Sequence, residues 1–457
     1  MRFLPCAAFA AAILAPAVAM AQVLPIAGDW SGALATPAGE LPLVFHIRPD
    51  GVATVDSPAQ KAQGLPARAV FVDGKARLKL AIGAASFEGT LSADGKTLEG
   101  QWRQGAGGAA LVMTRTATTA TAPSRPQTPK PPFPYSAQDV TYANPASGLV
   151  LAGTLTLPPG QGPFPAVLLI TGSGAQDRDE TIFDHKPFAL IADALTRRGL
   201  AVLRVDDRGI GGSAPFGHPA TLEDDDGDVV ASLAWLRARP EIDKARVGLL
   251  GHSEGGTLAI RAAAADPNVA FVVLLAAPGI RGGDLVVDQL GASLKAAGAP
   301  ADLVAAAQAG QREVIDIVVS PQEPATALPA LNAILDRSSV AADAPERLGL
   351  RTVLSPHYRS VARFDPRADL ARIRAPVLAL GGSKDTQVPA AQNLAAIKAA
   401  LPPRTDATVK ALPGLNHLFQ TAGTGLLGEY AVIEETMAPS ALTLIADWTT
   451  RHAGAGK

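Results

Sequence analysis

The sequence predicts an α/β fold, a doubly wound and mostly parallel sheet of eight strands, preceded by a small all-β module. Two observations predict this fold class. An early stretch alternates apolar and polar residues between Asp-Gly turns, which is typical of an antiparallel sheet. Further along, apolar strand-like runs alternate with helical runs, which is typical of a parallel sheet covered by helices.

Composition and charge narrow the class of protein. The 457 residues are enough for two or three domains, and a hydrophobic content of 47% with 18% charged residues is that of a globular protein. The net charge of -2 gives no reason to expect a nucleic-acid partner. Neither quantity indicates the oligomeric state.

The first 21 residues indicate a secretory signal peptide. A short positive start is followed by the apolar run Phe3–Val18 and by small residues at a cleavage site after Ala21. A membrane anchor is the alternative, but the run is short and Pro16 interrupts it. The single cysteine, Cys6, lies inside this segment, so the mature chain has no disulfide or thiol nucleophile. We therefore expect a periplasmic or secreted protein with no membrane span in the mature chain.

Residues 22–116 form the expected β-module, a small antiparallel barrel or sandwich. Its strand-like runs are Leu41–Arg48, Ala69–Val72, Ala76–Ile82, Ser86–Leu91 and Leu98–Trp102. Gly28–Gly32 and Leu98–Trp102 are expected to be the first and last strands, each with a Trp inside. His46 is interpreted as an ordinary strand residue, because a metal site needs several converging ligands. We therefore expect a structural or substrate-tethering module.

A Thr/Pro-rich tract, residues 117–135, is expected to be an extended linker, followed by an α/β domain over 136–457. Its expected strands are Asp139–Ala143, Leu151–Leu157, Ala166–Thr171, Ala201–Val205, Arg246–Gly251, Phe271–Ala276, Val377–Gly381 and Thr408–Leu412. Its expected helices are Lys186–Arg198, Leu222–Arg239, Gly255–Ala265, Ala390–Ala400 and Pro439–His452. Ala-rich residues 282–363 contain no strand signal, so we expect a helical cap between the sixth and seventh strands.

The motif Gly251-His252-Ser253-Glu254-Gly255 fits G-x-S-x-G, with an apolar strand before it and a helix after it. This context is that of a nucleophile elbow, a sharp turn that presents a serine at the edge of a sheet. The glycines leave room for the strand and the helix to pass closely, and the helix N-terminus directs N–H groups toward an oxyanion. Ser253 is therefore the candidate nucleophile.

A serine nucleophile needs a base, and the base needs a carboxylate that fixes its tautomer. His417 follows the last expected strand, where a loop at the carboxyl end of a strand suits a catalytic base. Asp385 follows the seventh expected strand, and the chain order Ser, Asp, His is that of α/β-hydrolases. A surface histidine and a turn or capping aspartate are the alternatives.

The loop after the third expected strand is the candidate oxyanion loop. Gly172 and Gly174 allow its backbone to approach a substrate, so the N–H groups of Ser173 and Glu254 are the expected oxyanion donors. A phosphate-binding loop is the alternative, but the chain has no G-x-x-x-x-G-K-[ST] or G-x-G-x-x-G motif. Asp177 and Arg178 are candidates for binding a polar group of the substrate, along with Gly172 and Gly174, and a local salt-bridged loop is the alternative.

The acidic run Glu223–Asp226 is expected to decorate a helix N-terminus, where the macrodipole favours carboxylates. A calcium site is the less favoured alternative, because the run lacks EF-hand spacing.

Several motifs together resemble exported bacterial α/β-hydrolases of the carboxylesterase and serine-aminopeptidase-like group. The motifs are Gly251–Gly256, Gly382–Asp385, Asn416-His417, Thr171–Gly174 and Asp206–Ser213. The β-module similarly resembles the lipocalin-like modules that precede some exported hydrolases. Thr171 stands where many relatives carry the His of a His-Gly pair. We expect this difference to leave the oxyanion hole intact, because backbone N–H groups form it.

The residues and the resemblance together indicate a serine hydrolase that needs no metal or other cofactor and cleaves carboxylic esters of small to medium acyl groups. A peptidase with the same triad is the first alternative, with Asp177, Asp179 or Glu254 as possible contacts for a substrate amine. A non-catalytic binding protein is the second alternative, against which the intact Ser, Asp and His argue.

Overall fold

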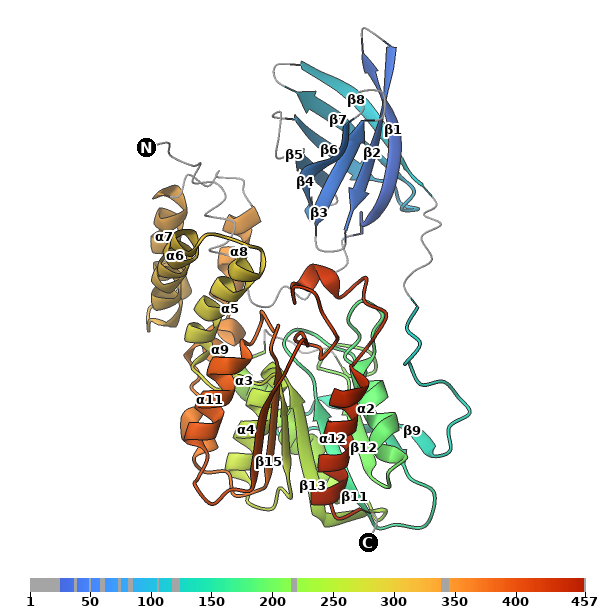
Figure 1. Cartoon of the computed structure of the whole chain (residues 1–457), viewed down its shortest axis with the longest axis vertical. Coiled ribbons are helices and arrows are strands. Elements are labelled where there is room, and N and C mark those ends of the chain that lie inside the picture. The colour runs from blue at the N-terminus through green and yellow to red at the C-terminus, as the bar shows by residue number, and fades with distance from the viewer. Residues whose placement is uncertain are drawn as a thin grey trace. The chain divides into compact units, whose positions relative to one another are not determined.

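The computed structural model describes residues 25–455, except for 37–38, 49–50, 58–61, 73–74, 81–84, 105–106, 117–123, 215–219 and 338–344. The expected signal peptide, with its cleavage site after Ala21, lies outside the described residues, as does part of the expected linker. The described residues form two compact units, one ending at Ser124 and the other beginning at Arg125 (Figure 1).

The first unit is a closed antiparallel barrel whose strands pair in chain order. The strands are β1 Gly28–Thr36, β2 Gly39–Ile47, β3 Val52–Ser57, β4 Ala62–Val72, β5 Lys75–Leu80, β6 Ala85–Leu91, β7 Thr97–Gln104 and β8 Gly107–Arg115. Trp30 and Trp102 are both buried among the aromatic and aliphatic side chains of the interior, as the alternation of the sequence indicates.

The barrel corrects one expectation, because Leu98–Trp102 lies in β7 and is not part of the last strand. The last strand is β8, which pairs with both β7 and β1 and so closes the barrel. The strand β3 was likewise not predicted. Both missed strands are rich in small residues, and their alternation of Ala, Gly, Thr and Val gives little contrast between the two faces.

The second unit contains an eight-stranded sheet with the order β16-β15-β14-β13-β11-β12-β10-β9. The strands are β9 Ser136–Ala143, β10 Val150–Leu157, β11 Phe164–Ile170, β12 Ala201–Val205, β13 Ile242–His252, β14 Val272–Leu275, β15 Val377–Gly382 and β16 Ala407–Leu412. The pairs β9–β10 and β10–β12 are antiparallel, and the other neighbours are parallel. The predicted mostly parallel sheet of the α/β-hydrolase fold is thus observed.

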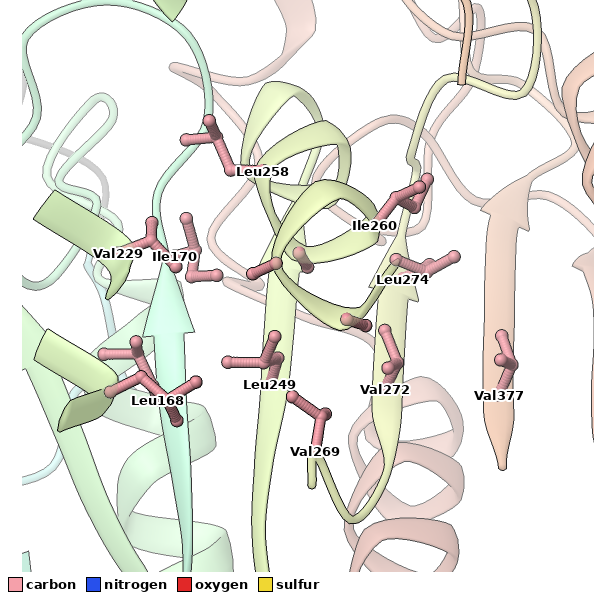
Figure 2. Packing of buried hydrophobic residues seen from close by; sticks show 14 of the residues in the cluster. Leu168, Ile170, Val229, Leu249, Leu258, Ile260, Val269, Val272, Leu274 and Val377 are labelled. Carbon is pink, nitrogen blue, oxygen red and sulfur yellow. The ribbon is translucent and has the colours of Figure 1, made fainter. Parts of the chain in front are cut away.

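Helices cover both faces of this sheet because its central strands are apolar on both sides. The covering helices are α2 Pro187–Thr196, α3 Leu222–Arg237, α4 Glu254–Ala265, α11 Ala390–Ala400 and α12 Pro439–His452, with the short α10 Arg367–Leu370 before β15. One face packs against α3, α4 and α11, and the other against α2 and α12. Figure 2 shows part of the first core, where Leu168 and Ile170 of β11 belong to the same cluster as Leu249 and Leu258.

Between β14 and β15 the chain forms a group of helices in the interval where a cap was expected. They are α5 Gly282–Ala296, α6 Ala301–Val319, α7 Pro324–Arg337, α8 Pro345–Val353 and α9 Pro356–Arg363. Side chains such as Val314, Leu331 and Leu350 give these helices a hydrophobic core of their own. Within the described part of the chain, none of the helices has the length and apolar character needed to cross a bilayer.

The start of the second unit differs from the expected linker boundary at residue 135. The Arg125 guanidinium donates to the carbonyls of Phe183, Ala431 and Ile433. Further along, the Gln127 side chain accepts hydrogen bonds from the N–H groups of residues 436 and 437, and Tyr135 Oη donates to an aspartate of α2. We call residues 125–135 the strap, because these contacts hold it against the second unit.

Candidate active site

Ser253 lies at the sharp turn between β13 and α4, with φ 54° and ψ −120°. Such a backbone conformation is strained for a residue with a side chain and persists only where the surroundings enforce it. A Cβ at Gly251 would collide with the backbone of Gly255, and a Cβ at Gly255 would collide with the carbonyl oxygens of Ile170 and Thr171. The two glycines therefore permit the tight strand–turn–helix that the motif predicts.

Asp385 and His417 lie in the loops after the adjacent parallel strands β15 and β16. The distance between His417 Nδ1 and Asp385 Oδ2 is 2.8 Å, and the two side chains are 5% and 0% exposed. The other oxygen, Asp385 Oδ1, accepts hydrogen bonds from the N–H groups of Gln387 and Val388. The carboxylate is thus fixed, and it orients His417 so that Nε2 is the ring nitrogen that does not face Asp385.

Among the described residues, Ser253 Oγ and His417 Nε2 do not form a hydrogen bond. The structure therefore brings Asp385 and His417 into direct contact and presents Ser253 at the same edge of the sheet.

Ser173 and Glu254, the expected oxyanion donors, line one cavity together with Ser253. Glu254 is the first residue of α4, so its N–H has no intrahelical acceptor. Apolar side chains form most of the remaining wall, among them Ile280 after β14 and residues of the cap helices α5 and α9. We call this space the apolar cavity.

Arg178 and Asp177 make local contacts of the kind expected for a salt-bridged loop. The Arg178 guanidinium pairs with Asp206 at 2.6 Å and with Asp139 at 2.9 Å. The Asp177 carboxylate accepts the N–H groups of residues 179 and 181, which closes a turn. These ion pairs balance the charge of Arg178 with carboxylates of the protein.

Gly172 and Gly174 line a second cavity, with a volume of about 350 Å³. Its wall includes the charged side chains of Asp206, Asp207 and Arg208, which the apolar cavity lacks. Burial raises the pKa of Asp207 to about 8, and Asp207 binds the oxyanion loop through the Thr171 hydroxyl and the N–H of residue 176.

His357, a residue of cap helix α9, lies in the wall that both cavities share, together with Glu254. Its Nε2 is 3.1 Å from Glu254 Oε1, and its Nδ1 is 3.4 Å from Asp225 Oδ2. Burial alone would lower the pKa of His357, but the hydrogen bonds to the two carboxylates outweigh burial and raise it to about 10. His357 is therefore an imidazolium paired with two anions.

Asp225, Glu254 and His357 are also the group of described residues that could hold a metal ion, since one ligand atom from each lies within 4.8 Å of the others. Both ring nitrogens already face carboxylates, so a hydrogen-bonded ion triad explains the cluster without a metal. Asp225 and its acidic neighbours occupy the first turn of α3, as expected from the sequence. Nothing in the sequence indicated His357, because the cap carries no motif.

His252, the residue before the nucleophile, pairs with Glu180 of the oxyanion loop at 2.9 Å. Burial opposes protonation, but the charge of Glu180 outweighs it and raises the pKa of His252. The sequence showed the charged run around residue 180 but did not indicate that its last carboxylate faces His252.

The parallel sheet, the strained serine at a strand–helix turn and the buried Asp–His pair define an α/β-hydrolase. A family model described as X-Pro dipeptidyl-peptidase (S15 family) matches residues 147–411, more than half of the chain. The chain therefore belongs to the S15 family. The match includes Ser253 and Asp385 and ends shortly before His417.

Similar proteins include two named esterases. Esterase EstD of Thermotoga maritima is 36% identical over 143 residues, which are 31% of this chain and 33% of that protein. Esterase FrsA of Klebsiella pneumoniae is 29% identical over 158 residues, 34% of this chain and 35% of that protein. An uncharacterized protein of Mycobacterium tuberculosis is 26% identical over 256 residues, 56% of this chain and 64% of that protein. The chain thus spans between about a third and two thirds of these relatives.

Proposed function

We propose that this protein is a serine hydrolase that cleaves carboxylic esters of small to medium acyl groups. In this proposal Ser253 is the nucleophile, His417 is the general base and Asp385 orients His417. One observation carries it: a strained Ser253 borders an apolar cavity together with both candidate oxyanion donors. The esterase names of two relatives support the choice of an ester as substrate.

The proposed reaction has two steps that share one set of groups. Ser253 Oγ attacks the acyl carbon while His417 Nε2 takes its proton, and the N–H groups of Ser173 and Glu254 stabilise the oxyanion. The intermediate collapses, the acyl–oxygen bond breaks, and His417 returns the proton to the leaving alcohol. Water activated by His417 then hydrolyses the acyl-enzyme. Asp385 stabilises the imidazolium that forms on His417.

The walls of the apolar cavity support an uncharged acyl group. Side chains such as Leu285, Val286 and Val361 would replace the water around an aliphatic chain, which stabilises it by about 0.8 kcal/mol for each buried methylene. His357 and Glu254 line both cavities, so we expect them to limit how far the acyl chain extends.

Hydrolysis of p-nitrophenyl acetate, butyrate and octanoate by the wild type and by Ser253→Ala tests the proposal. We expect ester turnover, with kcat reduced by on the order of 10⁴- to 10⁶-fold in Ser253→Ala. Turnover that is unchanged in Ser253→Ala would exclude Ser253 as the nucleophile. The dependence on chain length would give the size of the acyl group.

A peptidase using the same residues is the second candidate, favoured by the description of the family as X-Pro dipeptidyl-peptidase. Its substrate would carry an amide in place of the ester. An X-Pro p-nitroanilide in the same assay discriminates the two. Amide turnover without ester turnover would identify the protein as a peptidase. No turnover of any of these substrates would favour a binding protein.

A further inference from the structure

A buried ion pair lies directly behind the oxyanion loop. Glu180 Oε1 and His252 Nδ1 are 2.9 Å apart, and the two side chains are 1% and 6% exposed. Two ionised side chains lose most of their favourable hydration when they are buried to this extent. In addition, Glu180 has a positive φ of 52°, a conformation that few residues with a side chain adopt. The protein therefore maintains an unfavourable arrangement at this point.

The contacts of the pair indicate what it does. Glu180 Oε1 also accepts the N–H of Gly172 at 2.7 Å, next to the candidate oxyanion donor Ser173. On the other side, His252 Nε2 lies 3.1 Å from the carbonyl oxygen of His417. His252 itself immediately precedes Ser253 in the chain. The pair thus joins the oxyanion loop, the nucleophile turn and the loop that carries the base.

The hydrogen-bond pattern fits a protonated His252 beside an ionised Glu180. Its Nδ1 faces a carboxylate and its Nε2 faces a carbonyl, and both of these groups only accept hydrogen bonds when the carboxylate is ionised. Beside an ionised carboxylate both ring nitrogens donate, as they do only in the imidazolium. The ring of His252 lies 4.7 Å from the ring of His417, measured between centroids.

We propose that Glu180 and His252 are positioning residues that hold the Ser173 N–H and the His417 backbone in register with Ser253. This inference rests on the proposed function, in which Ser253 is the nucleophile. The pair does not touch the substrate. It fixes the geometry of the groups that do.

The variant Glu180→Gln tests this inference because it removes the charge and keeps the shape. Gly172 N–H and His252 both contact one oxygen, Glu180 Oε1, which an amide retains, so the acceptor stays while the imidazolium loses its counter-charge. We expect kcat to fall by about 10- to 100-fold, less than the roughly 10²- to 10³-fold loss that follows removal of an oxyanion donor. KM should stay nearly unchanged, since the apolar cavity is intact.

The matched control is Asp266→Asn, the same carboxylate-to-amide change at the opposite end of α4 from Ser253. Asp266 pairs with Arg237 there and so contributes to stability without facing the site. Both variants are compared by Tm, by kcat and KM for p-nitrophenyl butyrate, and by the rate at which a fluorophosphonate labels them. We expect slow labelling and a low kcat only in Glu180→Gln, whatever the two changes in Tm.

The double variant Glu180→Gln/His252→Gln adds a second test. Residues that act as a pair have non-additive effects, so its kcat should be no lower than that of Glu180→Gln alone. A Glu180→Gln enzyme with the kcat and labelling rate of Asp266→Asn would overturn the inference. The labelling rate also distinguishes the ester-hydrolase proposal from the positioning role of Glu180. A wild type that is labelled but cleaves no ester would contradict the ester-hydrolase proposal. Comparison of its labelling rate with that of Glu180→Gln would still show whether Glu180 positions the site.

Discussion

Asp385 is the residue whose contacts bear most directly on the proposed proton transfers. It holds His417 through one oxygen and two backbone N–H groups through the other. Asp385→Asn keeps the size and shape of the side chain but favours the wrong tautomer of His417. By analogy with the same Asp→Asn change in the Ser-His-Asp triad of serine proteases, we expect kcat to fall by roughly 10⁴-fold with little change in KM. Steady-state kinetics with p-nitrophenyl butyrate checks this, and a kcat near that of the wild type would show that Asp385 does not orient the base.

His357 gives a prediction about stability and pH. Its folded pKa of about 10 lies above the ordinary value of 6.5, so its ion triad stabilises the fold fully below pH 6.5. That contribution is lost as the pH rises through about 10. The difference in free energy of unfolding between the wild type and His357→Gln should therefore be largest near pH 6.5 and shrink toward pH 10. Urea denaturation of both proteins across this range measures it, and a constant difference would contradict the assignment of the charge.

Single residues were predictable from sequence where a local motif marks them. Ser253 follows from G-x-S-x-G, and His417 and Asp385 follow from their places after apolar strands. Glu180 and His357 were not recognised as parts of the site, because their partners are distant in sequence: His252 is 72 positions from Glu180. Long-range pairing of side chains depends on how the loops fold back, and one sequence does not show this.

The turn between β13 and α4 is the element on which the site depends. Gly255 allows α4 to pass the carbonyl oxygens of Ile170 and Thr171, where a Cβ would collide. Gly255→Ala should therefore destabilise the protein by about 1–3 kcal/mol and lower kcat, because backbone must move to relieve the overlap.

Gly227→Ala is the matched control. Gly227 lies inside α3, and a Cβ added there would be 3.6 Å from the nearest atom, Asn144 Nδ2. Alanine in a helix interior is favoured over glycine by about 0.5–1 kcal/mol, so this variant should be neutral or more stable. Thermal denaturation of the two variants decides the point. Equal effects would show that α4 does not depend on close packing at Gly255.

Helices and strands of the sheet were predictable because their periodicity is strong. The expected helices Ala390–Ala400 and Pro439–His452 agree with α11 and α12 residue for residue. The barrel was harder, since β8 contains glycine and alanine at its start and presents Val112 to solvent. Weak contrast between the two faces of a strand leaves little pattern to recognise.

At the scale of the whole molecule, the strap changes where the catalytic unit begins. Arg125 and Gln127 bind loops near residues 183 and 431–437, so a fragment that starts at residue 136 lacks these contacts. We expect a 125–457 fragment to have a higher Tm than a 136–457 fragment, since each lost hydrogen bond is worth about 0.5–1.5 kcal/mol. Thermal denaturation of both fragments measures this, and equal Tm values would show that the strap adds no stability.

Covalent capture of the nucleophile tests the central claim most directly. A fluorophosphonate forms a bond between phosphorus and the attacking serine oxygen as fluoride leaves, so intact-mass and peptide-mapping spectra identify the residue that reacts. We predict one phosphonyl group per chain, located on Ser253, and no labelling of Ser253→Ala. A label on another residue, or a Ser253→Ala protein that is labelled as fast as the wild type, would contradict the account.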